Sequence, residues 1–189
     1  MTKKELRKKY KELRKSLSTE DIEDLSMAIA NQILKLPIWD KKNFHVFLPI
    51  EHQKEVDTQY ILHVLHGKDK NVILSQSNFE DLSMKHFLLD DQITIKTNHW
   101  GIPEPINGIP IADELIDVVF VPLLAYDLKG HRVGYGKGFY DRFLSKCTKD
   151  VITIGVSFYP PEIQIDDASE WDVQLHYIVS PNEITKIAN

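Results

Sequence analysis

The residues best suited to chemistry lie in one stretch, 130–142, where glycine alternates with other residues in a G-x-G-x-G pattern. Glycines let backbone N–H groups approach an anion closely, and the N-terminus of a following helix adds partial positive charge. Arg132 and Lys137 supply fixed positive charge in the same stretch, and Asp141 is suited to hold a cation that accompanies phosphate. We therefore predict that this stretch is a phosphate-binding loop.

The pattern differs from two familiar phosphate-binding motifs. A Walker A loop needs Gly-Lys followed by Ser or Thr, whereas Gly138 follows Lys137 here. The dinucleotide-binding fingerprint is G-x-G-x-x-G, which has a longer second spacing. An apolar run at 117–126 precedes the glycines and a helical pattern at 143–147 follows them, so the loop is expected between a buried strand and a helix. A glycine-rich turn with solvated charges is the alternative.

The whole stretch resembles the signature of the 5-formyltetrahydrofolate cyclo-ligase family, also called methenyltetrahydrofolate synthetase, which reads approximately R-x-G-x-G-x-G-Y-Y-D. Residues 132–141 match it with Phe139 at the first tyrosine position, so any role of that tyrosine's hydroxyl is absent here. The resemblance implies that the loop binds ATP. The residues expected to contact ATP are Arg132, Val133, Gly134, Tyr135, Gly136, Lys137, Gly138, Phe139 and Tyr140, of which Lys137, Arg132 and Tyr140 are also expected to be catalytic.

Three other places resemble the same family. Lys3 and Arg7 match its basic opening helix, K-x-x-x-R, in which both cations contact ATP. Residues 55–58 match E-[VI]-x-T, in which the glutamate, here Glu55, contacts folate; a carboxylate accepts well from the adjacent N–H donors of a pterin. Trp100 precedes the family's G-I-x-E-P and is expected to stack on a flat ring of the substrate.

Each of these residues has a purely structural alternative. A basic helix face can simply be solvated, and a loop tryptophan can simply pack. Near Glu55, either Asp57 or Thr58 can cap the following helix while Glu55 lies in solvent.

A metal site is implied by the resemblance. The family has a histidine-aspartate pair before its closing strand, and that aspartate helps to hold magnesium. Trp171 and Asp172 stand at the pair's position, so the carboxylate is kept and its histidine neighbour, a possible partner of the metal ligand, is replaced by tryptophan. We expect Asp141 and Asp172 to hold Mg²⁺, with ATP as co-substrate.

Composition indicates one domain. The chain has 189 residues, 42% of them hydrophobic, and its single cysteine, Cys147, excludes a disulfide framework and a thiolate metal cluster. The N-terminus has no apolar signal-peptide core, and no apolar run approaches the length of a membrane span. We expect a cytoplasmic monomer with no membrane partner.

Charge is distributed unevenly along the chain. Residues 1–15 carry eight Lys or Arg and two Glu, although the whole chain has a net charge of -5. A basic segment is compatible with nucleic-acid binding, but the acidic remainder disfavours a large contact with a phosphate backbone. We expect no nucleic-acid partner.

Apolar runs alternate with helical patterns throughout. This favours a single α/β domain over 1–189, a three-layer fold with a mainly parallel central sheet flanked by helices. Ligands bind at the carboxyl ends of strands in such sheets, so Glu55, the glycine loop and Asp172 should meet in one cleft.

Residues 100–105 are turn-rich and are expected to be irregular. Helices are expected at 3–16, 19–36 and 58–67, and strands at 43–49, 71–75, 83–89, 117–126, 151–156 and 176–179.

The resemblance implies an ATP-dependent cyclo-ligase, which would convert 5-formyltetrahydrofolate to 5,10-methenyltetrahydrofolate through a phosphorylated formyl group, with ADP and phosphate as products. Two other classes stay open. A sugar-phosphate or acyl-transfer enzyme of similar architecture would show no magnesium-dependent nucleotide binding. A nucleotide-binding or RNA-binding module would bind RNA with strong salt dependence and ignore folates.

Overall fold

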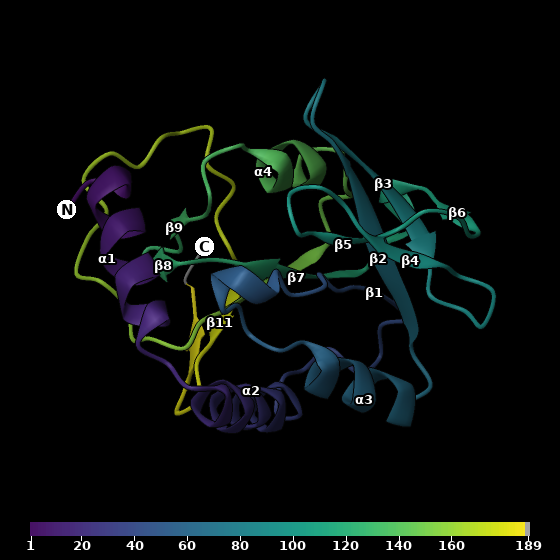
Figure 1. Cartoon of the computed structure of the whole chain (residues 1–189), viewed down its shortest axis with the longest axis horizontal. Coiled ribbons are helices and arrows are strands. Elements are labelled where there is room, and N and C mark those ends of the chain that lie inside the picture. Colours follow the sequence, from purple (N-terminus) through teal and green to yellow (C-terminus); the bar gives the residue numbers. More distant parts are fainter. Residues whose placement is uncertain (188–189) are drawn as a thin grey trace.

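A central eight-stranded sheet organises the computed structural model, which describes residues 1–187 (Figure 1). Its inner strands run parallel, and antiparallel pairs occur only toward its two edges. The predicted mainly parallel sheet is thus confirmed. In spatial order the strands are β12 (Ile184–Lys186), β11 (Tyr177–Val179), β10 (Ile152–Val156), β7 (Val118–Pro122), β1 (Asn43–His45), β2 (Asn71–Asn78), β3 (Ser83–Leu88) and β6 (Pro110–Ile111).

Helices cover both faces of this sheet, which gives the predicted three layers. Helices α2 (Thr19–Ile33) and α3 (Gln59–Gly67) lie on one side, and the short α4 (Phe139–Leu144) lies on the other (Figure 1). Strand β7 supplies buried side chains to both apolar clusters, Val118 and Phe120 to one and Val119 and Val121 to the other. A strand buried on both faces reads as an unbroken apolar run, which is why this segment was visible in the sequence.

Helix α1 (Lys3–Lys15) lies apart from these layers, beside the small hairpin of β8 (Ala125–Tyr126) and β9 (Arg132–Val133) (Figure 1). It begins with a capping box in which Thr2 Oγ1 accepts from Glu5 N at 3.3 Å and Glu5 Oε2 accepts from Thr2 N at 2.9 Å. Leu6 packs against Val133 in a small apolar cluster. Because β9 leads directly into the glycine stretch, this packing ties the helix to the predicted site.

Several predicted boundaries differ from the structure. Residues 103–105 are not irregular: they form β5 (Pro103–Pro105), paired antiparallel with β4 (Ile95–Thr97). Proline has no N–H to donate, and a two-stranded sheet of this length tolerates it where a central strand would not. The run 117–126 divides into β7 and β8, and the strand predicted at 43–49 ends at His45. Two 3-10 helices, η1 (Glu51–Gln53) and η2 (Asp113–Leu115), complete the regular elements within residues 1–187.

A membrane-spanning helix is not found anywhere in residues 1–187, since none combines the required length with sufficient apolar character.

A chain of polar side chains crosses three neighbouring strands beneath α4. His45 Nε2 lies 2.5 Å from Ser75 Oγ, and Ser75 Oγ lies 2.9 Å from His86 Nδ1. His86 Nε2 lies 3.1 Å from Asp113 Oδ1, without the alignment of a hydrogen bond. Burial lowers the pKa of His45 well below its ordinary value and lowers the pKa of His86 to about 4, so both rings are neutral in the fold at neutral pH.

This burial predicts acid sensitivity. A histidine whose pKa is lowered in the fold stabilises it above the unfolded pKa of about 6.5, and the stability is lost as pH falls toward 4. For His86 we expect about 2 kcal/mol of unfolding free energy to be lost between pH 7 and pH 5. The substitution His86→Asn should make this loss smaller. Urea unfolding of both proteins at the two pH values measures it, and an equal loss in both would contradict the prediction.

Candidate functional site

One cavity of about 630 Å³ brings the predicted site residues together at the carboxyl ends of the parallel strands. Its walls include Phe47 after β1, Ser77 at the end of β2 and Pro122 at the end of β7. The predicted residues that line it are Lys3, Arg7, Glu55, Trp100, Arg132, Gly134, Tyr135, Gly136, Lys137, Gly138, Phe139, Tyr140, Asp141 and Asp172. Segments from five separate parts of the sequence thus share a single cleft, as expected from the topology.

Val133 is the predicted residue that does not line the cavity. Its side chain is fully buried and packs with Leu6 and Leu124, and its carbonyl accepts from Leu124 N at 2.7 Å. The Val133 side chain therefore lies outside the cavity, and an ATP contact by this residue stays a prediction that only its backbone could fulfil. Successive side chains of a strand point to opposite sides, and here the apolar one faces helix α1 while Arg132 turns toward the site.

The glycine loop follows β9 and ends at the first turn of α4. Gly136 and Gly138 have φ angles of +93° and +73°, a left-handed region that other residues adopt only with strain. A Cβ atom at Gly136 would lie 3.1 Å from Arg7 Cζ, so the backbone and helix α1 approach each other closely. Backbone geometry therefore favours glycine at 136 and 138, and the Arg7 side chain limits the space at Gly136, whereas a Cβ atom at Gly134 would meet nothing within 4 Å.

Three cations on one face of α1 hold the loop. Arg7 Nε donates to Gly134 O at 2.8 Å, and Lys11 Nζ lies 5.4 Å from the centre of the Tyr135 ring. Arg14 Nη1 lies 3.0 Å from the Tyr135 hydroxyl oxygen, to which it donates. Spacings of four and three residues place these side chains in a row on the helix. The helix is thus a support for the loop as well as a source of positive charge.

Arg14 was missed by the sequence analysis. It is only 4% exposed, and its Nη2 donates to Leu123 O at 2.7 Å. A buried arginine is rare unless it is paired, and the sequence shows only a lysine- and arginine-rich helix. Its spacing of seven from Arg7, on the same face, is the one signal that could have identified it.

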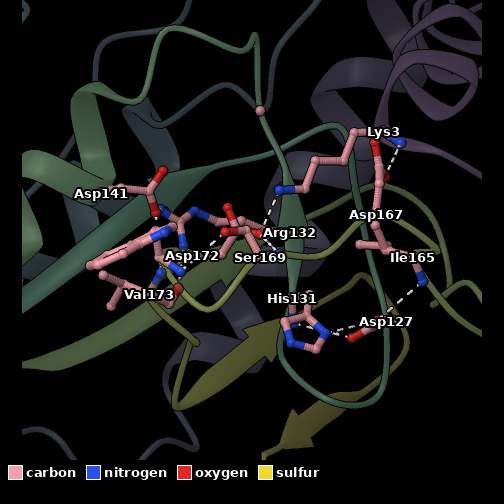
Figure 2. A network of polar contacts seen from close by, with 12 residues as sticks. Lys3, Asp127, His131, Arg132, Asp141, Ile165, Asp167, Ser169, Asp172 and Val173 are labelled. Atoms are coloured by element: carbon pink, nitrogen blue, oxygen red, sulfur yellow. Dashed lines mark hydrogen bonds and ion pairs between the residues drawn. The ribbon is translucent and has the colours of Figure 1, made fainter.

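Lys3 and Asp172 form an ion pair at the edge of the cavity (Figure 2). Asp172 Oδ2 also accepts from Ser169 N at 2.7 Å, and Lys3 N donates to Asp167 Oδ1 at 2.6 Å. Burial alone would raise the pKa of Asp172, but the hydrogen bonds from Lys3 and Ser169 outweigh it, so the pKa is lowered. Asp172 is therefore ionised at neutral pH.

Arg132 and Asp141 form a second ion pair in the same wall (Figure 2). Arg132 Nη2 donates to Asp141 Oδ1 at 2.6 Å, and its Nη1 donates to Val173 O. Val173 N donates back to Asp141 Oδ1 at 3.2 Å, which closes the arrangement. Arg132 is buried, and Asp141 balances its charge. Its bond to Val173 O attaches the start of the glycine loop to the segment that carries Asp172.

The two aspartates predicted to hold Mg²⁺ both line the cavity. Each has one carboxylate oxygen bonded to the protein, while its other oxygen accepts no hydrogen bond from residues 1–187. The same residues contain no group of three or more His, Cys, Asp or Glu side chains that could hold a metal ion. Two carboxylates with remaining positions for phosphate oxygens and water suit Mg²⁺, which is commonly bound in that way.

Glu55 lines the cavity, so the alternative that its side chain lies in solvent is wrong. It is 5% exposed; its Oε2 accepts from Ile50 N at 2.7 Å and its Oε1 from the Tyr135 hydroxyl at 2.8 Å. Burial raises its pKa, against the effect of the Ile50 N–H and the Arg14 charge.

Of the two residues that could cap the helix after Glu55, only Asp57 does so. Asp57 Oδ1 accepts from Gln59 N at 3.0 Å, whereas the Thr58 hydroxyl donates to Phe47 O at 2.7 Å and does not cap. Glu55 takes no part in capping, which leaves its carboxylate to the cavity.

Aromatic side chains form a further part of the cavity lining. Trp100 is 47% exposed and stacks on Phe79 at 4.0 Å between ring centres, and Phe79 meets Phe139 edge-on at 5.1 Å. Phe79 was not among the predicted residues; it lies in the hairpin between β2 and β3. Tyr140 lies deeper, where burial raises the pKa of its hydroxyl and keeps it protonated. Such a wall suits a flat, partly apolar ligand.

The contacts of Arg132 predict that another positively charged side chain cannot replace its guanidinium group. Arg132→Lys keeps the positive charge but cannot reach Asp141 and Val173 O together. We expect a loss of about 1.5–3 kcal/mol of unfolding free energy, typical of one hydrogen bond involving a charged group, and weaker ATP binding. Urea unfolding and calorimetry measure the two effects. A variant as stable as the original chain, with normal ATP affinity, would contradict this role.

Comparison with known proteins agrees with this geometry. A family model described as the 5-formyltetrahydrofolate cyclo-ligase family matches residues 1–181. A 5-formyltetrahydrofolate cyclo-ligase from Haemophilus influenzae is 28% identical, with 93% of this chain and 95% of the relative covered. A mouse protein of the same name is 26% identical, with 86% of each covered.

Two solved structures share the fold. The NMR structure of 5,10-methenyltetrahydrofolate synthetase from Aquifex aeolicus superposes with a TM-score of 0.83 at 28% identity, covering 100% of this chain and 94% of the other. A synthetase of that name from Mycoplasma pneumoniae gives a TM-score of 0.75 at 23% identity, covering 96% and 99%.

Proposed function

The chain belongs to the 5-formyltetrahydrofolate cyclo-ligase family, and from this premise we propose that it uses ATP to convert 5-formyltetrahydrofolate to 5,10-methenyltetrahydrofolate, releasing ADP and phosphate. The observation that carries the proposal is one shared cavity. Its lining combines the glycine loop and nearby cations with Glu55 and aromatic rings. Two chemically different substrates need two such subsites within reach of each other.

The phosphate subsite is formed by the glycine loop and α1. Lys3, Arg7 and Lys137 line the cavity around Gly134 and Gly136, so positive charge and backbone N–H groups converge there. Asp172 balances Lys3 before the nucleotide binds. A site built in this way holds a triphosphate and stabilises the charge on the phosphoryl group in transfer.

The folate subsite lies toward Glu55 and Trp100. Glu55 accepts from the N–H donors of the pterin, and Trp100 and Phe79 offer flat surfaces to its rings. Binding both substrates in one cavity places the formyl oxygen beside the terminal phosphate, and the alignment itself contributes to the rate.

The formyl group must be activated before the ring can close. An amide-like oxygen is a poor leaving group, and phosphorylation turns it into a good one. The neighbouring folate nitrogen then closes the ring as phosphate leaves. Lys137 and Arg7 neutralise the transferred group, and the Tyr140 hydroxyl, which stays protonated, is available to donate a hydrogen bond to a substrate in the cavity.

Asp141 and Asp172 would hold Mg²⁺ through their free carboxylate oxygens. When bound with ATP, the ion neutralises phosphate charge and orients the phosphates. Lys3 and Arg132, which neutralise the two carboxylates in the structure, would then share them with the ion.

Monomeric state, a cytoplasmic location and the absence of a nucleic-acid partner stay predictions from the sequence. Two of the cations of α1, Arg7 and Arg14, bond to the glycine loop.

The proposal is tested by mixing the protein with ATP, Mg²⁺ and 5-formyltetrahydrofolate and following the absorbance of the methenyl product. We expect product only when all three are present, with ADP formed in equal amount. ADP formation without methenyl product, or no reaction with folded protein, would contradict the proposed reaction.

Gly136→Val should abolish ATP binding, because the added side chain meets Arg7 and a β-branched residue does not adopt the required φ angle. Gly67→Val is a matched control, since a Cβ atom there meets nothing within 4 Å. Calorimetry with ATP measures both. Unchanged ATP affinity in folded Gly136→Val protein would mean that the loop does not bind the phosphates.

Glu55→Gln should weaken folate binding about tenfold to hundredfold, equivalent to about 1.5–3 kcal/mol, because the amide NH₂ opposes a pterin donor. ATP affinity should hardly change, since the phosphates lie against the other wall. Asp57→Asn, which can still cap α3, serves as the control. Normal folate affinity in Glu55→Gln, measured by calorimetry, would remove Glu55 from the site.

A further inference from the structure

Tyr135 connects the two halves of the cavity. It belongs to the glycine loop, yet its hydroxyl donates to Glu55 Oε1 at 2.8 Å and accepts from Arg14 Nη1 at 3.0 Å. Arg14 is anchored in turn by Leu123 O at 2.7 Å. A continuous chain of hydrogen bonds therefore runs from α1, through the loop assigned to the nucleotide, to the carboxylate assigned to folate.

In this chain of hydrogen bonds, each group has a fixed role as donor or acceptor. Arginine can only donate and an ionised carboxylate can only accept, so the Tyr135 hydroxyl must accept from Arg14 and donate to Glu55. Burial and the Glu55 charge raise the pKa of Tyr135, which keeps its proton available for this bond. All three side chains are largely buried, where an unmatched polar group is costly.

Glu55 keeps room for a ligand in this arrangement. A carboxylate offers about four acceptor positions, and the protein occupies two of them, through Tyr135 and the Ile50 N–H. Ile50 and Tyr135 bond to different oxygens of Glu55, so the two bonds hold the carboxylate in one orientation and leave its other acceptor positions to a ligand.

From these contacts we propose that Tyr135, itself fixed by Arg14, is a positioning residue for folate: it orients Glu55 to receive the N–H donors of the pterin. This rests on the proposed function, in which Glu55 binds folate. The role differs from the ATP contact expected for a residue of the glycine loop, because it acts on the other substrate.

The same bond affects the pH at which Glu55 works. The groups that face Glu55 are Arg14 from α1, His52 from η1, Tyr135 from the loop and Tyr140 from α4. Burial raises the pKa of Glu55, and the Tyr135 hydroxyl lowers it by bonding to the charged form. Removal of that hydroxyl raises the pKa further, so binding that needs the carboxylate is lost at a higher pH as the solution is acidified.

The test uses Tyr135→Phe in the full chain, with calorimetric titration of 5-formyltetrahydrofolate alone between pH 5 and pH 8. We expect about tenfold weaker binding at pH 7, as for loss of a hydrogen bond to a charged group, and an acid decline that begins at higher pH. Tyr10→Phe is the matched control: its hydroxyl also bonds a carboxylate, Glu162 Oε1, at 2.7 Å, and neither residue lines the cavity. It should leave folate affinity and its pH dependence unchanged.

A double substitution separates positioning from general stability. If Tyr135 acts through Glu55, then Tyr135→Phe in a Glu55→Gln background should cause little further loss of folate affinity and no shift in pH dependence. Normal affinity and an unshifted pH profile in Tyr135→Phe would overturn the proposal, as would fully additive losses in the double variant. Normal affinity in Glu55→Gln alone would instead show that the folate assignment has failed, and the positioning role with it.

Discussion

The site depends on helix α1 lying against the glycine loop. Leu6 on one turn is buried beside Val133, and this apolar contact brings the polar face of the same helix to the loop that follows β9. Arg7 then bonds to Gly134 O, and Arg14 reaches Tyr135. Buried and half-buried cations so close together are stable only because carboxylates and carbonyl oxygens balance them. The fold thus concentrates positive charge where a polyanion must bind.

The parallel sheet determines which segments can meet that charge. Its strands end at one edge, so the loop after β1 brings Glu55, the end of β2 brings Ser77 and Phe79, and the segment before β11 brings Asp172. Polar contacts then attach the segment that carries Asp172 to its neighbours: Lys3 of α1 forms an ion pair with Asp172, and Arg132 of the glycine stretch donates to Val173 O (Figure 2).

Local signals in the sequence predicted much of this, and long-range contacts account for what it missed. The capping boxes at Thr2 and Ser18 and the apolar run through β7 depend on neighbouring residues, so they could be recognised directly. Strand β5 could not, because its two prolines argue against a strand unless its single partner is known. The bond between Tyr135 and Glu55 joins residues 80 positions apart, and the burial of Arg14 depends on Leu123. Motif spacing carries no information about such pairs.

The central claim is that one cavity holds both substrates, with phosphates on the glycine loop and the pterin at Glu55. The most direct test is an experimental structure of the protein with a non-hydrolysable ATP analogue, Mg²⁺ and 5-formyltetrahydrofolate. The account predicts phosphate oxygens against residues 134–138, within reach of Lys3 and Arg7, and pterin N–H groups on Glu55 while Tyr135 keeps its bond to that carboxylate. A nucleotide bound away from this loop, or a folate that does not contact Glu55, would contradict it.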